Sequence, residues 1–169
     1  MTSRASIARH PIHPVLVAFP IGLWVFALAC DLIYHWGAHV PFWKDVSFYA
    51  MVGGLIGALA AAIPGFVDYL TIVDRKVRRL GTAHLVLNLT VVVLYAVNLW
   101  IRNRALPEAT MPVWLSAGSL VLLSLSGWFG GEMVYVHGMA VEPRRAGASI
   151  DVTAAPPRPG RADDVRRPA

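Results

Sequence analysis

Charged residues and cysteine are both scarce in this sequence. Lysine, arginine, aspartate and glutamate make up 15% of the 169 residues, whereas a soluble domain carries about 25%. With a mean hydropathy of +0.55, this composition argues against a soluble domain and predicts an integral membrane protein. Because Cys30 is the single cysteine, an intramolecular disulfide and a cysteine-based zinc site are excluded.

Motifs of hydrolases and phosphate-binding proteins are also missing. The sequence contains no GxSxG, no HExxH and no glycine-rich phosphate loop, so hydrolysis has little support. The net charge of +5 does not indicate nucleic-acid binding, because the basic residues gather on one side of the predicted membrane instead of forming a binding face. The sequence leaves open whether the protein is an enzyme.

Long apolar runs are what the chain does contain. Four of them reach or approach the ~20 residues that cross about 30 Å of hydrocarbon, and they cover residues 14–36, 46–67, 80–101 and 109–131. We therefore predict an all-α integral membrane protein in which four transmembrane helices form an up-down bundle, with the lipid bilayer as its surroundings. Pro20 predicts a kink or a local loosening inside the first helix.

The predicted domain organisation follows from these runs. The four-helix domain spans residues 10–141, after a short basic and mobile cytoplasmic lead at 1–9. Residues 142–169 are rich in proline, arginine, alanine and aspartate and are expected to be a disordered cytoplasmic tail. No internal repeat is convincing.

The basic residues predict the orientation. Four spans return the chain to the side on which it starts, and that side carries most of the arginines, including those of the expected loop Asp74–Arg79. The other side holds only Lys44, Arg102 and Arg104. The positive-inside rule thus places both termini in the cytoplasm, and we predict a multi-pass protein of the bacterial inner membrane.

Polar residues inside the spans indicate which faces point inward. His84, Asn88, Tyr95 and Asn98 lie at offsets 0, 4, 11 and 14, which is one face of the third helix. Such a face should point into the bundle, because ionisable and polar groups are expensive in lipid. In the second span, a stripe of small residues predicts close helix packing, and it consists of Gly53, Gly57 and Ala61.

Alternating helix directions bring imidazole and carboxylate groups to one depth near the cytoplasmic face. These groups are His10, His13, Asp68, His84, Glu132 and His137. Each also has a structural interpretation: the first two as helix-entry residues, Asp68 and Glu132 as partners of the basic loop, and His84 as a donor to a backbone carbonyl. His137 is the residue of the six most readily interpreted as having no role. On the opposite side, Asp31, His35 and His39 come from one neighbourhood and are interpreted as loop residues.

Three chemistries could use the cytoplasmic layer. Haem b needs two axial imidazoles on facing helices, for which His13 and His84 are the first candidates, followed by His10. A single transition metal could use the same imidazoles. Proton relay is the third, because histidine titrates near neutral pH. Four residues could relay protons or fix the orientation of a ligating imidazole through a hydrogen bond, and these are Glu132, Asp68, His137 and Asn88.

Two segments resemble a known family. The stretches HPIHPVLVAFPIGLW at His10–Trp24 and GWFGGEMVYVHG at Gly127–Gly138 are similar to the bacterial membrane family called domain of unknown function 2231, and the resemblance covers His10–Val141. It implies a compact four-helix membrane domain whose signature polar positions are His10, His13, Glu132 and His137. His84 enters from the depth argument alone.

The resemblance also bears on partners. Some relatives are joined to Rieske-type iron–sulfur domains, which favours electron transfer over hydrolysis. This chain lacks the cysteines to hold such a cluster, so an iron–sulfur or other redox protein would be a separate partner. The resulting hypothesis is a haem- or metal-binding component of membrane electron transfer. The alternative is a non-enzymatic membrane scaffold or partner subunit with a structural His/carboxylate network. The sequence also leaves open whether the protein forms a homo-oligomer.

Overall fold

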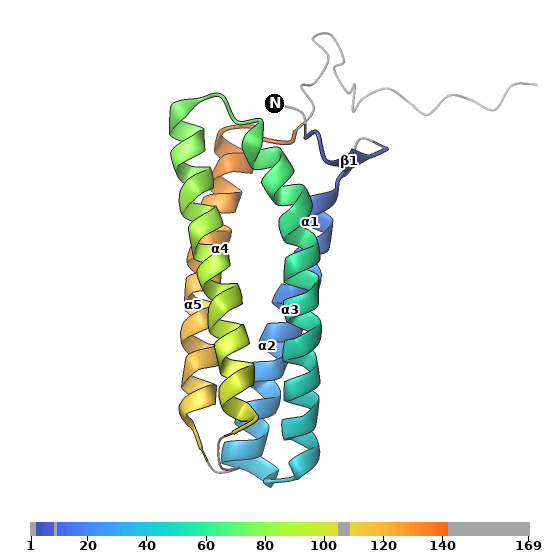
Figure 1. The fold of residues 1–169 in the computed structure, drawn as a ribbon, viewed down its shortest axis with the longest axis vertical. Helices are drawn as coiled ribbons and strands as arrows, with labels where there is room; N and C mark the ends of the chain where they lie inside the picture. Colours follow the sequence, from blue (N-terminus) through green and yellow to red (C-terminus); the bar gives the residue numbers. More distant parts are fainter. Residues whose placement is uncertain (1–2, 9, 105–108, 142–169) are drawn as a thin grey trace, which may run out of the picture.

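The computed structural model describes residues 3–8, 10–104 and 109–141, and these segments form a bundle of long antiparallel helices (Figure 1). The predicted tail at 142–169 lies outside the described residues. The long helices are α2, Ala18–Ile33; α3, Pro41–Leu70; α4, Arg75–Arg102; and α5, Met111–Gly131. Shorter elements are β1, Ser6–Ile7; β2, His10–Pro11; α1, Ile12–Leu16; and the π-helical turns η1, Tyr34–Ala38, and η2, Glu132–Val136.

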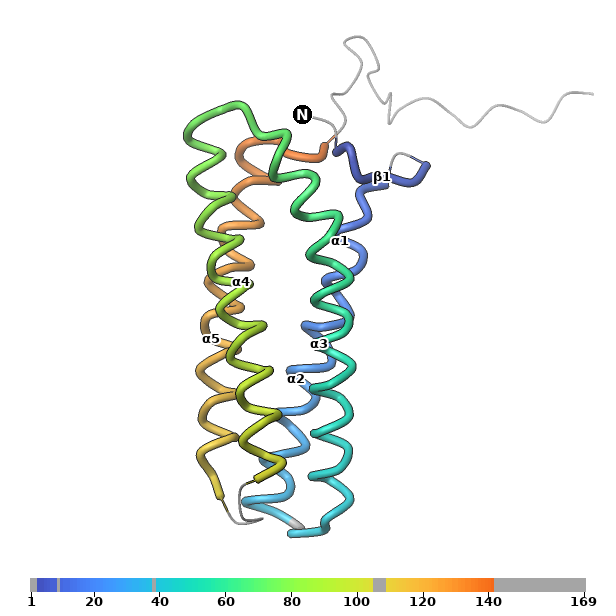
Figure 2. The backbone as a smooth tube through the Cα atoms, in the orientation of Figure 1, coloured from blue at the N-terminus to red at the C-terminus, as the bar shows by residue number. Residues whose placement is uncertain are grey.

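The bundle has four segments long and apolar enough to cross a membrane, at 12–37, 41–70, 75–102 and 111–136, which confirms the predicted fold class. Two hairpins build it: α2 packs along α3, and α4 packs along α5. Contacts of α3 with α4 and of α2 with α5 join the hairpins, so α2 and α4 stand on one diagonal of the bundle. The path of the backbone shows both hairpins side by side (Figure 2).

The first span is interrupted where proline requires it. α1 ends at Leu16 and α2 begins at Ala18, with Val17 between them. Pro20 has no N–H to donate to the carbonyl of Leu16, four residues earlier, and the helix therefore breaks one turn before it. The expected local loosening of the first span is confirmed, as an interruption of one residue at Val17.

Helix starts differ from the expected ones at two positions. α1 begins at Ile12 with Pro11 as its N-cap, so it begins before the expected start at residue 14 and His13 lies in its first turn. The expected loop Asp74–Arg79 is mostly helical, because Asp74 is the N-cap of α4 and its Oδ1 accepts from the N–H groups of Lys76 and Val77 at 2.8 and 2.9 Å. The basic residues thus lie in the first turns of α4.

The described part of the basic lead, Ser3–Ala8, is hydrogen bonded to the bundle, whereas the sequence predicted a mobile segment. The carboxylate of Asp68, at the end of α3, accepts from the Ser3 hydroxyl at 2.7 Å and from the backbone N–H groups of Arg4 and Ala5 at 3.0 and 3.1 Å. β1 then pairs with β2 in an antiparallel ladder. These bonds hold the lead on the end of the bundle that carries the α3–α4 connection.

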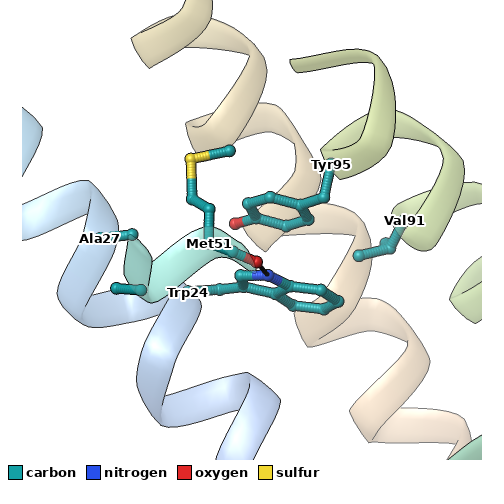
Figure 3. Close-up of a cluster of buried hydrophobic side chains, with 6 residues drawn as sticks. Trp24, Ala27, Met51, Val91 and Tyr95 are labelled. Atoms are coloured by element: carbon teal, nitrogen blue, oxygen red, sulfur yellow. Dashed lines mark hydrogen bonds between the residues drawn. The ribbon is translucent and has the colours of Figure 1, made fainter. Parts of the chain in front are cut away.

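The core lies where the two hairpins meet. Trp24 of α2 stacks on Tyr95 of α4 with ring centroids 4.1 Å apart, and both rings are buried (Figure 3). Met51 of α3 accepts a hydrogen bond from the Trp24 indole N–H through its backbone oxygen at 3.3 Å. The indole lies so close to Gly54 that an added Cβ there would be 2.4 Å from Trp24 Nε1. The core therefore depends on a glycine facing a large ring.

The predicted stripe of small residues is confirmed as a packing surface. A Cβ added to Gly53 would lie 3.3 Å from Leu23, and one added to Gly57 would lie 3.3 Å from Pro20. Ala61 continues the stripe and is buried. Close approach of α3 to the first span follows from these small side chains.

A pseudo-two-fold relation between the hairpins emerges from the contacts across the centre. Side chains of the first span meet side chains of α4 in three pairs, each separated by 71 residues, namely His13 and His84, Trp24 and Tyr95, and Asp31 and Arg102. The residues fall at offsets 0, 11 and 18 from each histidine, which is one helical face. The chain therefore contains two matching helical hairpins around a common axis, although its sequence shows no convincing repeat.

Candidate functional site

His13 is positioned by the second helix of its own hairpin. Its Nδ1 lies 2.8 Å from the carbonyl oxygen of Ala61, and because a carbonyl can only accept, Nδ1 carries the proton. The ring also lies against Gly65, where an added Cβ would be 2.6 Å from Nδ1. In this tautomer Nε2 keeps its lone pair, and it has no hydrogen-bond partner among the described residues.

His84 is held in the same way in the other hairpin. Its Nδ1 lies 2.8 Å from the carbonyl oxygen of Ser126, and a Cβ added to Gly130 would approach the ring at 3.2 Å. In both hairpins the accepting carbonyl thus precedes the facing glycine by one turn. The expected interpretation of His84 as a donor to a backbone carbonyl is confirmed.

The two imidazoles meet on the pseudo-two-fold axis. Their ring centroids are 6.2 Å apart and their planes are inclined by 83°. Each ring is tied by Nδ1 to its own hairpin, so both are oriented by the backbone before any ligand arrives. Imidazoles that bind metals almost always have such a hydrogen bond on the second nitrogen.

Asn88 and Ser126 complete the surroundings of His84. The Asn88 amide nitrogen lies 3.1 Å from His84 Nε2, 2.8 Å from the His84 carbonyl oxygen and 2.7 Å from Ser126 Oγ. Because the amide has two hydrogens for three acceptors, the contact with Nε2 is the longest and weakest. Asn88 therefore shields the lone pair of His84 through an interaction that is easily exchanged.

The other predicted site residues lie near this end of the bundle but do not join the pair. Asp68 binds the lead and makes no ion pair with Arg75 or Arg78 among the described residues. The Glu132 carboxylate makes no hydrogen bond or ion pair within the part of the chain that the structure describes. His10 is exposed and its Nδ1 lies 2.9 Å from the Ala8 carbonyl oxygen.

His137 lies beyond α5, next to the start of α4. Its Nε2 is buried without a hydrogen-bond partner in the described segments. The Val77 backbone N–H holds the pKa of Asp74 below its ordinary value, and the Lys76 N–H and the nearby charges of His137 and Lys76 lower it further. Among residues 3–8, 10–104 and 109–141, no three His, Cys, Asp or Glu side chains gather closely enough to hold a metal ion.

A second polar cluster lies at the opposite end of the axis, and the interpretation of Asp31 as a loop residue is wrong. Asp31 is 1% exposed and forms a two-pronged ion pair with the guanidinium of Arg102, whose Nη1 donates to Oδ1 at 2.8 Å. Arg102 Nε also donates to Asn98 at 2.9 Å, and Asn98 donates to Ser116 Oγ at 2.9 Å. A buried charge needs such partners.

The Asp31–Arg102 pair could have been found from the sequence. Both residues continue the inward faces that contain His13 and His84, 18 residues further along, which is five helical turns. An acid and a base on inward faces at the same depth should pair, since an isolated charge in lipid is expensive.

Comparisons with known proteins give one match. A family model described as "Predicted membrane protein (DUF2231)" matches residues 9–143, which confirms the family resemblance predicted from the sequence. No curated protein and no solved structure matches the chain.

Proposed function

The chain belongs to DUF2231, a family of predicted membrane proteins, and we propose that its four-helix domain holds a b-type haem between His13 and His84 as a component of membrane electron transfer. The observation that carries this proposal is the facing pair of imidazoles, 6.2 Å apart between centroids. Each ring comes from a different hairpin and has its Nδ1 hydrogen bonded to a backbone carbonyl.

The free nitrogen of each ring is the atom that would hold the iron. The Nδ1 atoms of His13 and His84 are bonded to backbone carbonyl oxygens, so Nε2 would be the ligand atom in each ring.

The number of donors favours haem over a bare metal ion. Two imidazoles satisfy a haem iron, whose other four ligands come from the macrocycle, whereas a single transition metal would need at least one more protein ligand or several waters. In the described segments, no third His, Cys, Asp or Glu side chain completes such a set. A single metal ion therefore ranks second among the possible cofactors.

The residues of the chain would orient, tune and protect the site. Ala61 and Ser126 fix the two rings through their carbonyl oxygens, and Asn88 would release His84 Nε2 while keeping its bond to Ser126 Oγ. A bound haem supplies one-electron storage, and burial and hydrogen bonding set its potential.

His13→Ala and His84→Ala in the full-length protein test the proposal. We expect each variant to insert in the membrane and to lose haem, as measured by the visible spectrum per mole of protein. Asn88→Ala is the matched comparison, because it removes a neighbour of His84 but no axial ligand, and it should retain haem. Full haem content in both histidine variants would refute the assignment of the ligands.

A second candidate function is a non-enzymatic scaffold or partner subunit. The contact of Asn88 with His84 Nε2 and the two histidine–carbonyl bonds favour it, since together they form a network that ties helix ends. Under this proposal the histidine variants would lower the thermal unfolding midpoint, and the wild-type protein would carry no cofactor.

Orientation and partners belong to the same proposal. The described chain begins and ends at the end of the bundle that holds the basic start of α4 (Figure 1). The positive-inside rule favours a cytoplasmic position for this end in a bacterial inner membrane. A separate iron–sulfur or other redox protein would then exchange electrons with the site, either with the monomer or with a homo-oligomer.

A further inference from the structure

The end of the bundle opposite the histidine pair contains a polar cleft of about 320 Å³, far from the described start and end of the chain (Figure 1). It lies where the start of α3 meets the end of α4 and the start of α5. Its lining includes charged and aromatic side chains, among them Lys44, Asp45, Phe48, Tyr49 and Arg102. The volume lies at the lower end of the range of small-molecule sites, about 300–1,000 Å³.

Two tryptophans place this cleft at the boundary between lipid and water. Trp100 and Trp114 each lie two residues from a lining residue, Arg102 and Pro112 respectively, which is about 3 Å along a helix. Both indole rings are mostly exposed, at 59% and 66%. Exposed tryptophans of this kind are typical of the aromatic belt at the level of the lipid head groups. A ligand in the cleft therefore lies among head groups.

Arg102 offers fixed hydrogen-bond donors to the cleft. Three of its five N–H groups are used by the ion pair with Asp31 and by the bond from Nε to Asn98. The other two have no acceptor among the described residues. Because the existing bonds hold the guanidinium in place, little conformational freedom is lost when a ligand binds to it. A guanidinium group is well suited to the oxygens of a phosphate.

An unpaired carboxylate determines which ligand suits the cleft. Asp45 is exposed and makes no hydrogen bond or ion pair in the part of the chain that the structure describes. It would repel a ligand that carries only negative charge, whereas it would attract one that also carries an ammonium group. The Lys44 ammonium lies over the ring of Tyr34, 5.1 Å from the centroid. The groups that face a ligand are thus donors at Arg102 and Asn103 and an acceptor at Asp45.

We infer that this cleft binds the head group of phosphatidylethanolamine, a phospholipid with one phosphate and one ammonium group. The phosphate accepts hydrogen bonds from Arg102 and from the Asn103 amide, and the ammonium donates to Asp45. Tyr49 also lines the cleft and is 72% exposed on the outer surface of the bundle, where lipid surrounds it, so the acyl chains leave the cleft on this side. The inference goes beyond the proposed function and requires no haem.

Native mass spectrometry of the detergent-purified full-length protein tests this inference. The protein is mixed with equal amounts of phosphatidylethanolamine and phosphatidylglycerol that have identical acyl chains. Both lipids carry a phosphate, but only phosphatidylethanolamine carries an ammonium group. We expect the wild-type protein to retain about one phosphatidylethanolamine per chain and to prefer it over phosphatidylglycerol at least threefold, because the ammonium pairs with a carboxylate.

Three variants separate the cleft from general effects. Asp45→Asn removes the charge that attracts the ammonium, and it should reduce the preference to below 1.5-fold. Asn103→Ala removes a donor to the phosphate and should weaken the binding of both lipids roughly two- to tenfold. Arg104→Ala is the matched control, because Arg104 is a neighbouring charged residue that is exposed and does not line the cleft. It should keep the preference of the wild type.

Two results would overturn the lipid site. One is equal retention of the two lipids by the wild-type protein, and the other is an unchanged preference in Asp45→Asn. Soluble glycerophosphoethanolamine, which has the same head group without acyl chains, distinguishes the lipid from a soluble ligand. It should not displace phosphatidylethanolamine at equal concentration, and displacement would contradict the assignment of a lipid to the cleft.

Discussion

Asp31 and Arg102 form a charge pair that lies out of water, so each residue depends on the other. Replacing Arg102 by Met keeps most of the side-chain volume but leaves the Asp31 carboxylate buried and unpaired. Removing one member of a buried pair destabilises a protein by about 3–5 kcal/mol. We therefore expect Arg102→Met to lower the thermal unfolding midpoint in detergent strongly, as measured by circular dichroism.

Arg104→Ala is the matched control for this prediction. Arg104 lies two residues further along, is exposed, and places its guanidinium over the face of Trp100, 4.7 Å from the centroid. Its loss should change the midpoint little. If Arg102→Met and Arg104→Ala lowered the unfolding midpoint equally, the Asp31–Arg102 pair would not hold the hairpins together.

Asp74 gives a prediction about pH. The Val77 N–H lowers its pKa in the folded protein, so the cap stabilises the folded state fully above the ordinary Asp pKa of about 4 and loses this effect as the pH falls through the lower, folded pKa. Asp74→Asn keeps an accepting oxygen without a charge. The stability difference between wild type and this variant should therefore shrink between pH 6 and pH 3. A stability difference that stays constant from pH 6 to pH 3 would contradict the role of the Asp74 carboxylate as a charged cap of α4.

Single residues were predictable from the sequence where depth and helical face agreed. His13 and His84 share a depth, and the structure brings their rings together. Asp31 was missed because it stands near the end of an apolar run, where a loop role is easily assumed. The role of Asp68 was missed for another reason. Its partners are backbone N–H groups of the lead, and no pattern of side chains in the sequence predicts such bonds.

Helix packing around the histidines depends on two glycines. A methyl group added at Gly65 would lie 2.6 Å from His13 Nδ1, so Gly65→Ala must push the imidazole away from Ala61. Overpacking of this kind destabilises by about 1–3 kcal/mol. We expect a lower unfolding midpoint and, under the haem proposal, a lower haem content. Gly130→Ala should lower the unfolding midpoint less, because the added methyl group would lie 3.2 Å from its nearest neighbour, His84 Cε1.

Gly118→Ala is the control for the glycine variants. It lies in the same kind of helix, in α5, but nothing is within 4 Å of its added Cβ. Alanine is favoured over glycine in a helix by up to about 1 kcal/mol, so this variant should be neutral or stabilising. If Gly65→Ala were equally well tolerated, the close approach of His13 to α3 would not be required for stability.

The helices were easier to predict than their ends. Length and composition are enough for membrane-spanning helices, since roughly 20 apolar residues have few alternatives in lipid. Their ends depend on local bonds, such as the carboxylate of Asp74 at the start of α4. The π-helical turn η2 depends on packing against α4, which no periodicity encodes.

The whole molecule shows how a repeat can be hidden from sequence inspection. Few residues carry it, and two of the three pairs on the axis join unlike side chains, with Trp24 facing Tyr95 and Asp31 facing Arg102. Lipid-facing positions need only be apolar and therefore diverge freely. The equivalence of the hairpins becomes visible once the contacts are known.

Membrane orientation is tested at the scale of the whole molecule. The basic start of α4 predicts that the chain termini face the cytoplasm. Green fluorescent protein fused to the C-terminus should therefore fluoresce in bacterial cells, and alkaline phosphatase fused there should be inactive. Active phosphatase together with dark fluorescent protein would contradict the orientation.

The most direct test of the central claim is a reduced-minus-oxidised visible spectrum of the detergent-purified full-length protein, with metal content determined on the same sample. The account predicts a Soret band with sharp α and β bands at close to one haem per chain. A colourless protein without stoichiometric iron or another transition metal would contradict it, and the contacts of His13 and His84 would then be a structural network.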